Sequence, residues 1–197
     1  MCDTIIVVGE NMNKKLNKTE QIILKKLKEA KGNILGIGLD KEEYIEALEN
    51  NEQIKICNLL NSYDGPLTYE NKGRQKKIHI KNLRKKFKKK RVDELFCNYQ
   101  EIIPYQNTFI PDSIYINKTK IYLFGSTNSK KEKENIEKIL KKYNRYKIKI
   151  EKNEENKSAL YIIDTSKTKT NRIVNFIYYI IDTISDTIEY ILNLLSL

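Results

Sequence analysis

Apolar residues along this chain come in short runs separated by amphipathic segments, a pattern typical of strands that alternate with helices. The clearest run is residues 32–40, Gly-Asn-Ile-Leu-Gly-Ile-Gly-Leu-Asp, whose apolar centre is interrupted and ended by glycines. A helical period precedes it over residues 19–30, and another follows it over residues 41–50. A buried strand between two helices, with glycines at its carboxyl end, is where open α/β sheets bind nucleotides.

The same patterns predict the rest of the chain. Further strands are expected at 53–60, 76–80, 92–99 and 120–124, and helices at 82–91 and 131–143. Residues 146–151 and 159–164 are two strand patterns joined by a polar link, which predicts an antiparallel hairpin. Residues 63–75 contain a turn and no apolar period, so we expect a loop there. Two prolines interrupt residues 101–116, which predicts a broken helix or a loop.

The last part of the chain has the strongest helical period. Apolar residues recur every three or four positions from Ile173 to Leu195, while Asp182, Asp186 and Glu189 take the other face. These acidic residues argue against a membrane span and against an anionic membrane surface. We therefore expect this helix to pack on its own domain, to self-associate or to bind a partner protein, with a lipid surface as the less favoured alternative.

The order of these elements predicts the fold class. Strands that alternate with helices imply parallel strands joined by right-handed crossovers. We expect an α/β fold with a mostly parallel sheet, a C-terminal antiparallel hairpin and an appended amphipathic helix. The predicted division is one domain over residues 1–170, followed by the helix at 171–197.

The charge balance of the chain leaves two interpretations open. Lysine and arginine number 37 against 26 aspartates and glutamates, a formal charge of +11. Such a balance favours polyanions such as nucleic acid, but it also arises where lysine is used as a solvated surface residue. The densest basic run lies in residues 81–91, and its candidate nucleic-acid contacts are Arg84, Lys85, Lys86, Lys88 and Lys89. The alternative is a solvated helix face held by Leu83 and Phe87.

Residue types that commonly carry chemistry are few. Cys2, Cys57 and Cys97 have neither metal-ligand spacing nor the pattern of a secreted disulfide framework, which favours a reduced, cytoplasmic protein. No signal peptide is expected, because no basic region precedes the short apolar run near the start. The single histidine, His79, lies between lysines in a predicted strand, where outward exposure is expected. No metal site and no nucleophile–base pair is predicted.

Over about residues 17–165, the element order resembles that of the class I (Rossmann-like) S-adenosylmethionine-dependent methyltransferases. The match consists of Ile34-Leu35-Gly36-Ile37-Gly38 for the first strand and its turn, residues 92–99 for the fourth strand, and the hairpin at 146–164 for the last two. The resemblance implies S-adenosylmethionine as the cofactor, bound at the carboxyl ends of the early strands.

The residues that this resemblance places at the cofactor are also those that depart from the family. The implied cofactor contacts are Gly36, Gly38, Asp40, Asn58 (or Asn61), Asn82 and Asn98, with Tyr99 near the methyl acceptor. Gly36 stands where the family has an acidic residue, and Leu39 and Asp40 stand in its glycine loop. Asn58 and Asn82 stand where acidic residues usually meet the ribose and the adenine. We therefore expect either a methyltransferase of unknown acceptor or a catalytically inactive relative.

Overall fold

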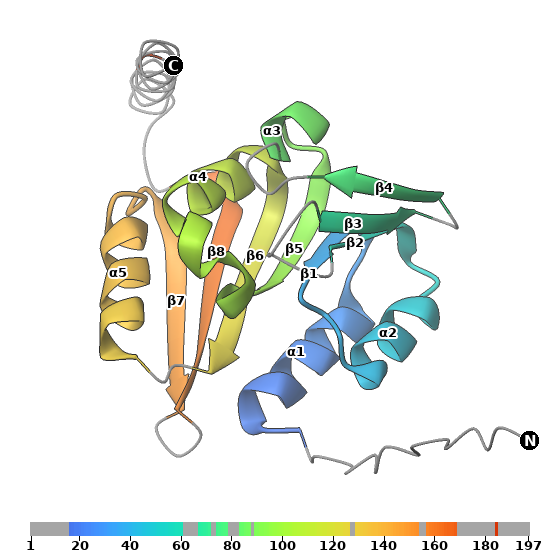
Figure 1. Cartoon of the computed structure of the whole chain (residues 1–197), viewed down its shortest axis with the longest axis horizontal. Coiled ribbons are helices and arrows are strands. Elements are labelled where there is room, and N and C mark those ends of the chain that lie inside the picture. Colours follow the sequence, from blue (N-terminus) through green and yellow to red (C-terminus); the bar gives the residue numbers. More distant parts are fainter. Residues whose placement is uncertain are drawn as a thin grey trace, which may run out of the picture.

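A computed structural model describes residues 16–60, 67–71, 74–78, 83–87, 89–126, 129–153, 157–168 and 184. These residues form an eight-stranded sheet in the order β4-β3-β2-β1-β5-β6-β8-β7, with helices on both faces (Figure 1). The predicted tail helix lies outside the described residues except for Ile184, and so do His79 and Asn82. Association through Ile173–Leu195, and the domain boundary at residue 170, stay predictions.

The elements have the following bounds. The strands are β1 (Gly32–Ile37), β2 (Ile54–Leu60), β3 (Leu67–Asn71), β4 (Arg74–Ile78), β5 (Val92–Asn98), β6 (Asn117–Ser126), β7 (Tyr146–Asn153) and β8 (Ser158–Thr168). The helices are α1 (Lys18–Glu29), α2 (Glu42–Glu49), α3 (Leu83–Lys86), α4 (Gln106–Ile116) and α5 (Lys130–Lys141), with a 3-10 helix, η2 (Tyr99–Tyr105), between β5 and α4.

The centre of the sheet is parallel, as predicted. β1 runs parallel to β2 and to β5, and β5 runs parallel to β6. β8 then pairs antiparallel with β6, and β7 antiparallel with β8. This confirms the α/β class, the mostly parallel Rossmann-like sheet and its antiparallel closing hairpin.

The other edge of the sheet differs from the prediction. A loop over residues 63–75 and a strand over 76–80 were expected, whereas β3 and β4 form a hairpin on β2, with β2 antiparallel to β3. The link between β2 and β3 explains the difference. It is only six residues long, and a parallel strand needs a crossover of about a dozen residues or more.

Of two predicted helical segments, one is much shorter in the structure and the other is a broken helix. The expected helix at 82–91 is the four-residue α3, and Lys90 beyond it has a φ of 55°, a left-handed conformation that cannot continue an α-helix. Residues 101–116 form the broken helix rather than the loop. η2 contains Pro104, and α4 contains Pro111.

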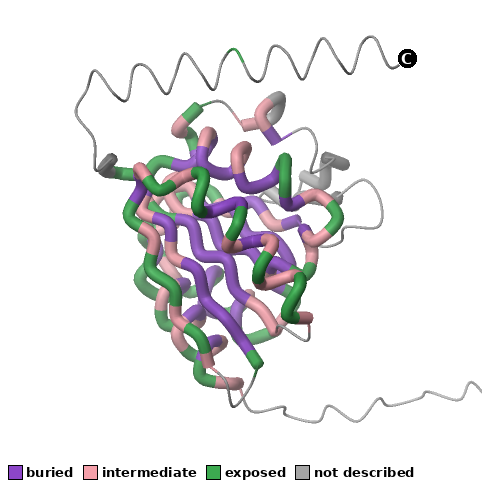
Figure 2. The backbone as a smooth tube through the Cα atoms, turned by 90° about the vertical axis from the view of Figure 1, so that its left-hand side faces the viewer, coloured by how far each residue is buried: buried purple, intermediate pink, exposed green. Residues whose placement is uncertain are grey.

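Two apolar clusters cover the two faces of the sheet. On one face, α1 and α2 contribute Ile23, Leu27 and Tyr44, which pack with residues of the central strands such as Ile34 and Phe96. On the other face, η2, α4 and α5 pack on a second set of strand residues. The central strands are accordingly buried along most of their length (Figure 2).

The end of α1 nearest the start of the chain is fixed by polar contacts. Asn17 caps α1, accepting a hydrogen bond from the Glu20 amide, and the Glu20 carboxylate accepts one from the Asn17 amide. The hydroxyls of Thr19 and Ser158 lie 2.8 Å apart, which ties α1 to the start of β8. None of the helices among the described residues combines the length and the apolar character needed to cross a membrane.

Candidate functional site

The strand order identifies the end of the sheet where a ligand is expected. From β1 the chain passes through α2 to β2 on one side, whereas β5 lies on the other side of β1. Strand order thus reverses between β1 and β5, and open α/β sheets bind ligands at the carboxyl ends of strands at such a point. We call this end the carboxyl rim and define it by residues 38–41, 98–101 and 125–126.

Gly38 is the turn residue of the carboxyl rim. Its φ is 63°, and its amide donates a hydrogen bond of 3.0 Å to the Leu60 carbonyl. A Cβ atom at this position would lie 2.5 Å from Cγ of Glu101 and 3.0 Å from Cβ of Asn98. Glycine is therefore required here both by the left-handed backbone and by the protein's own side chains.

Gly36 is likewise enclosed by protein atoms. A Cβ atom on Gly36 would lie 2.6 Å from Cδ1 of Leu39 and 2.8 Å from Cδ2 of Leu59. Leu39 belongs to the loop that follows β1, yet its side chain is fully buried in the core beneath α1 and α2. This loop thus fills the space beside Gly36 with its own leucine.

Asp40 lies beside these glycines but takes no part in their packing. Its side chain is exposed, and the N-cap of α2 is its neighbour Lys41, which makes no side-chain capping bond. Lys41 instead forms an ion pair of 2.9 Å with Glu20 of α1. Asp40 is therefore at the carboxyl rim, open to solvent.

The asparagines predicted at the cofactor have structural surroundings. Asn58 is buried within β2, opposite Leu35 of β1, two residues before the strand ends. Asn98 is half-buried at the end of β5, and its Oδ1 accepts a hydrogen bond of 3.3 Å from the Gln100 amide at the start of η2. Of the two, only Asn98 lies at the carboxyl rim.

The expectation that Tyr99 lines an acceptor cleft does not fit its position. Tyr99 has no exposed surface, and its ring packs edge-on against Tyr161 of β8, with 6.4 Å between the ring centres. The physical reason is strand alternation, because Leu95, Cys97 and Tyr99 all point to the same buried face of the sheet.

Two polar residues of the carboxyl rim were missed by sequence reasoning. Glu101 packs against Gly38, and Gln100 donates a hydrogen bond of 3.2 Å from Nε2 to the Ser126 carbonyl, which joins the ends of β5 and β6. Both lie in η2, in or next to a segment whose prolines predicted a broken helix or a loop. The sequence did contain one signal for a helix start here. Asn98 is followed closely by polar residues, and asparagine commonly caps helices.

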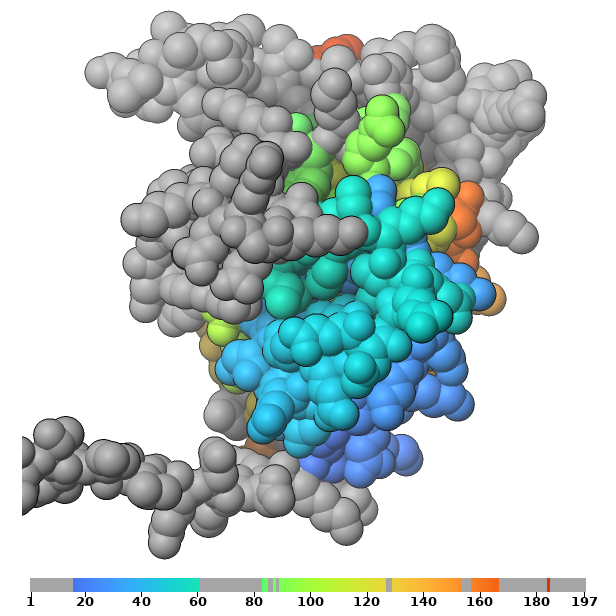
Figure 3. All heavy atoms as spheres, turned by 90° about the vertical axis from the view of Figure 1, so that its right-hand side faces the viewer, coloured from blue at the N-terminus to red at the C-terminus, as the bar shows by residue number. Residues whose placement is uncertain are grey.

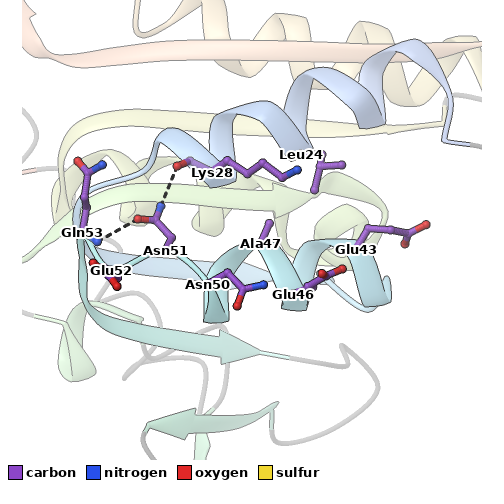
Figure 4. Close-up of a pocket in the computed structure, with 9 residues that line it drawn as sticks. All are labelled: Leu24, Lys28, Glu43, Glu46, Ala47, Asn50, Asn51, Glu52 and Gln53. Carbon is purple, nitrogen blue, oxygen red and sulfur yellow. Dashed lines mark hydrogen bonds between the residues drawn. The ribbon is translucent and has the colours of Figure 1, made fainter.

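A hollow of the described surface lies elsewhere, between α1 and α2. It encloses about 650 Å³, and its lining residues are Leu24, Lys28, Glu43, Glu46, Ala47, Asn50, Asn51, Glu52 and Gln53 (Figure 4). Figure 3 shows the face of the molecule formed by α1, α2 and β2. A second pocket of about 470 Å³ lies between η2, α4 and α5. Neither pocket is lined by Gly36 or Gly38.

Asn51 gives the α1–α2 groove a structural explanation. Its Nδ2 donates to the carbonyls of Leu27, Lys28 and Ala30 over 2.9 to 3.2 Å, and its Oδ1 accepts from the Gln53 amide. These bonds satisfy carbonyls that the end of α1 would otherwise leave without partners. The groove therefore marks where two helices are tied together, at the opposite end of the sheet from the carboxyl rim.

The cofactor implied by the sequence resemblance fits this site only in part. The left-handed glycine at the strand-order reversal fits an adenosyl cofactor, whereas Leu39 and Glu101 occupy the space that a Cβ atom on Gly36 or Gly38 would need. The buried cysteine nearby, Cys97, has a pKa well above its usual value, owing to burial and to the Glu101 charge. Among the described residues, no group of three potential ligands is placed to hold a metal ion.

The fold itself identifies the class. A glycine turn after the first strand, a strand-order reversal beside it and an antiparallel closing hairpin define a class I, Rossmann-like methyltransferase fold. Among solved structures, the chain is similar to a proposed S-adenosyl-L-methionine-dependent methyltransferase from Methanococcus maripaludis, with 13% identity and a TM-score of 0.51, over 77% of this chain and 84% of that one. At this identity the likeness shows the fold alone.

Two further structures are more distant. A precorrin-6y C5,15-methyltransferase from Geobacter metallireducens has 12% identity and a TM-score of 0.40, over 79% of this chain and 92% of that one. A methyltransferase from Pyrococcus furiosus has 13% identity and a TM-score of 0.37, over 75% and 81%. With TM-scores below 0.5, neither likeness supports a statement about this chain. No protein-family model and no curated protein matches the sequence.

Proposed function

We propose that this protein is a non-catalytic, methyltransferase-like protein. The observation that carries the proposal is the packing of Leu39 and Glu101 into the spaces beside Gly36 and Gly38. Glycines in such a loop serve a cofactor by letting it approach the backbone closely. Here the protein's own atoms make that approach, so the two glycines have a structural reason that needs no ligand.

The energetic cost of opening this packing supports the proposal. Leu39 is fully buried, and removing a leucine side chain from such a site costs about 2–5 kcal/mol. Each 1.4 kcal/mol is about a tenfold loss of affinity. A cofactor that had to displace Leu39 would therefore bind from about 30-fold to several thousandfold more weakly than one entering a preformed site.

Calorimetry tests the proposal directly. S-adenosylmethionine and S-adenosylhomocysteine are titrated into the full chain at millimolar ligand, next to an active methyltransferase in the same buffer. We expect no saturable heat from this chain and normal binding by the control enzyme. Saturable one-to-one binding in the micromolar range would overturn the proposal.

A second candidate is an S-adenosylmethionine-dependent methyltransferase, favoured by the left-handed Gly38 at the strand-order reversal. In that case Asp40 and Glu101 would face a cofactor whose amino and sulfonium groups are cationic, and the bound cofactor would supply the methyl group. Glu101→Gln would then weaken binding about tenfold, since charge-assisted hydrogen bonds are worth roughly twice neutral ones. If the wild-type chain binds and this variant binds about tenfold more weakly, the second candidate replaces the first.

A further inference from the structure

A group of cations lies at the opposite end of the sheet, where β5, β6 and β7 begin. Arg84 comes from α3, Lys89 and Lys90 from the turn before β5, and Arg145 from the turn before β7. We call these four residues the Tyr115 cluster, after the tyrosine in the last turn of α4, and this end of the sheet the amino rim. In Figure 1, β6 and β7 end at the bottom, whereas α3 lies at the top.

Three members of the cluster contact α4, and the fourth, Arg145, lies over the ring of Tyr146, 5.1 Å from its centre. The Arg84 guanidinium lies 4.8 Å from the centre of the Tyr115 ring, and Lys89 Nζ lies 6.0 Å from the same centre. Lys90 donates from its amide to the Tyr115 carbonyl at 3.2 Å and from Nζ to the Ile114 carbonyl at 3.4 Å. Asp112 of α4 forms an ion pair with Arg84.

Helix stabilisation accounts for one of these cations. Lys90 bonds to the last carbonyls of α4, where the helix dipole favours a positive charge. This contact at the helix end needs only one positive charge, yet Lys89 and Arg145 lie close to Lys90. Burial, together with these two charges, lowers the pKa of Lys90 to about 8. Like charges gathered in this way raise the electrostatic energy of the free protein, and a bound anion would lower it.

We propose that the Tyr115 cluster binds the phosphate backbone of nucleic acid. Four cations from three segments present charge in several directions, which suits a chain of phosphates better than a single one. Lys89 is exposed, while Arg84, Lys90 and Arg145 are partly exposed. The sequence had indicated one basic helix, whereas the structure assembles the charge from α3 and two turns. The site lies at the other end of the sheet from the carboxyl rim, so it does not depend on the proposed function.

Nucleic acid is favoured over a membrane by what the cluster lacks. A protein that lies on a membrane combines its cations with apolar side chains that enter the lipid. The exposed large apolar residues of the described chain are Ile56, Ile150 and Ile184. None of the three belongs to the segments that supply the cluster. Arginine and tyrosine, by contrast, offer planar groups on which bases stack.

The test is binding of a fluorescein-labelled, single-stranded oligoribonucleotide to the full chain, followed by fluorescence anisotropy at several salt concentrations. The variant is Lys89→Glu with Arg145→Gln. The matched control is Lys130→Glu with Lys131→Gln, which makes the same charge change at the start of α5, beside the carboxyl rim. We expect the first variant to lose at least tenfold in affinity and the control to stay within about twofold. The slope of log affinity against log salt should fall by about 1.4, since each of the two lost phosphate contacts contributes about 0.7.

Three results would overturn the proposal: no binding by the wild-type chain, equal losses in both double variants, or cluster-dependent binding to phosphatidylserine vesicles without binding to the oligoribonucleotide. Circular dichroism and thermal unfolding check that each variant folds. If the double variant does not fold, Lys89→Glu against Lys130→Glu decides the question, because both side chains are exposed.

Discussion

The two ends of the sheet differ in both packing and charge. At the carboxyl rim, where the fold class leads one to expect a ligand, Glu101 packs against Gly38, and Leu39 packs in the core against Gly36 of β1. At the amino rim, where the fold class predicts nothing, Arg84 and Lys89 lie over the Tyr115 ring, Lys90 bonds to the end of α4, and Arg145 lies close to Lys90. Strand order thus indicates where related folds bind ligands, while side chains decide which end of a particular protein is able to do so.

The comparison also shows how a glycine motif should be interpreted. Position 38 requires glycine whether or not a cofactor is bound, because its backbone is left-handed and because Glu101 and Asn98 lie against it. A glycine pattern after a strand is therefore evidence for a tight turn first. It becomes evidence for a ligand only when the space beside the glycine is empty.

Among the variants that test this comparison, Leu39→Ala is expected to have the largest effect on the free energy of unfolding. We expect a loss of about 3 kcal/mol in the free energy of unfolding, since the change leaves a cavity in a fully buried site. Leu24→Ala is the control, because Leu24 is only partly buried and lines the α1–α2 groove. Urea denaturation measures both variants. If Leu39→Ala cost no more than the control, Leu39 would not fill the rim as described.

Gly38→Ala should cost about 2 kcal/mol in the free energy of unfolding, from backbone strain and from the contact with Glu101. Adding Glu101→Ala should recover part of this loss, because it removes Cγ and leaves only the strain. Asp40→Ala, at an exposed position, should stay within about 0.5 kcal/mol of the wild type. Strictly additive losses in a double-mutant cycle would show that Glu101 does not press on Gly38.

At the amino rim, Asn51→Ala should lower the free energy of unfolding by about 1–2 kcal/mol, because it leaves carbonyls at the end of α1 without their donor. Asn50→Ala is the matched control at the neighbouring, exposed position. Chemical denaturation of the two variants gives the difference. Equal stabilities would mean that Asn51 does not hold α1 and α2 together.

The smallest effect concerns Lys90 and pH. Its folded pKa of about 8 lies below the usual 10.5, so the unfolded chain binds more protons between these values. Stability contributed by this group should therefore rise as pH increases from 8 toward 10.5, by less than about 1 kcal/mol because the side chain is partly solvated. Lys90→Met should remove the rise. NMR titration of the lysine Nζ groups should show one lysine near pH 8, and its absence would contradict the described burial.

Much of the fold could be predicted because its signals are local. The apolar runs of β1, β5 and β6 and the period of α5 appear directly in the sequence, and they place the parallel core correctly. The hairpin β3–β4 was missed because residues 63–75 show no apolar period. The available signals were the short link after β2 and Gly73, a turn residue between Leu67-Thr68-Tyr69 and Ile78.

The candidate site was harder to predict. Tyr99 could have been placed in the core from its alternation with Leu95 and Cys97, but its position at the end of a strand suggested a cleft instead. The position of Glu101 over Gly38 depends on η2 folding back over the rim, which no local pattern records. The Tyr115 cluster joins residues about 60 positions apart in the chain, so only the tertiary structure brings Lys90 and Arg145 together.

Titration calorimetry of S-adenosylmethionine into the full chain, without nucleic acid, decides whether the protein's own side chains close the carboxyl rim. We expect only the heat of dilution up to millimolar cofactor. A saturable one-to-one isotherm with a Kd in the micromolar range would show that the rim is open.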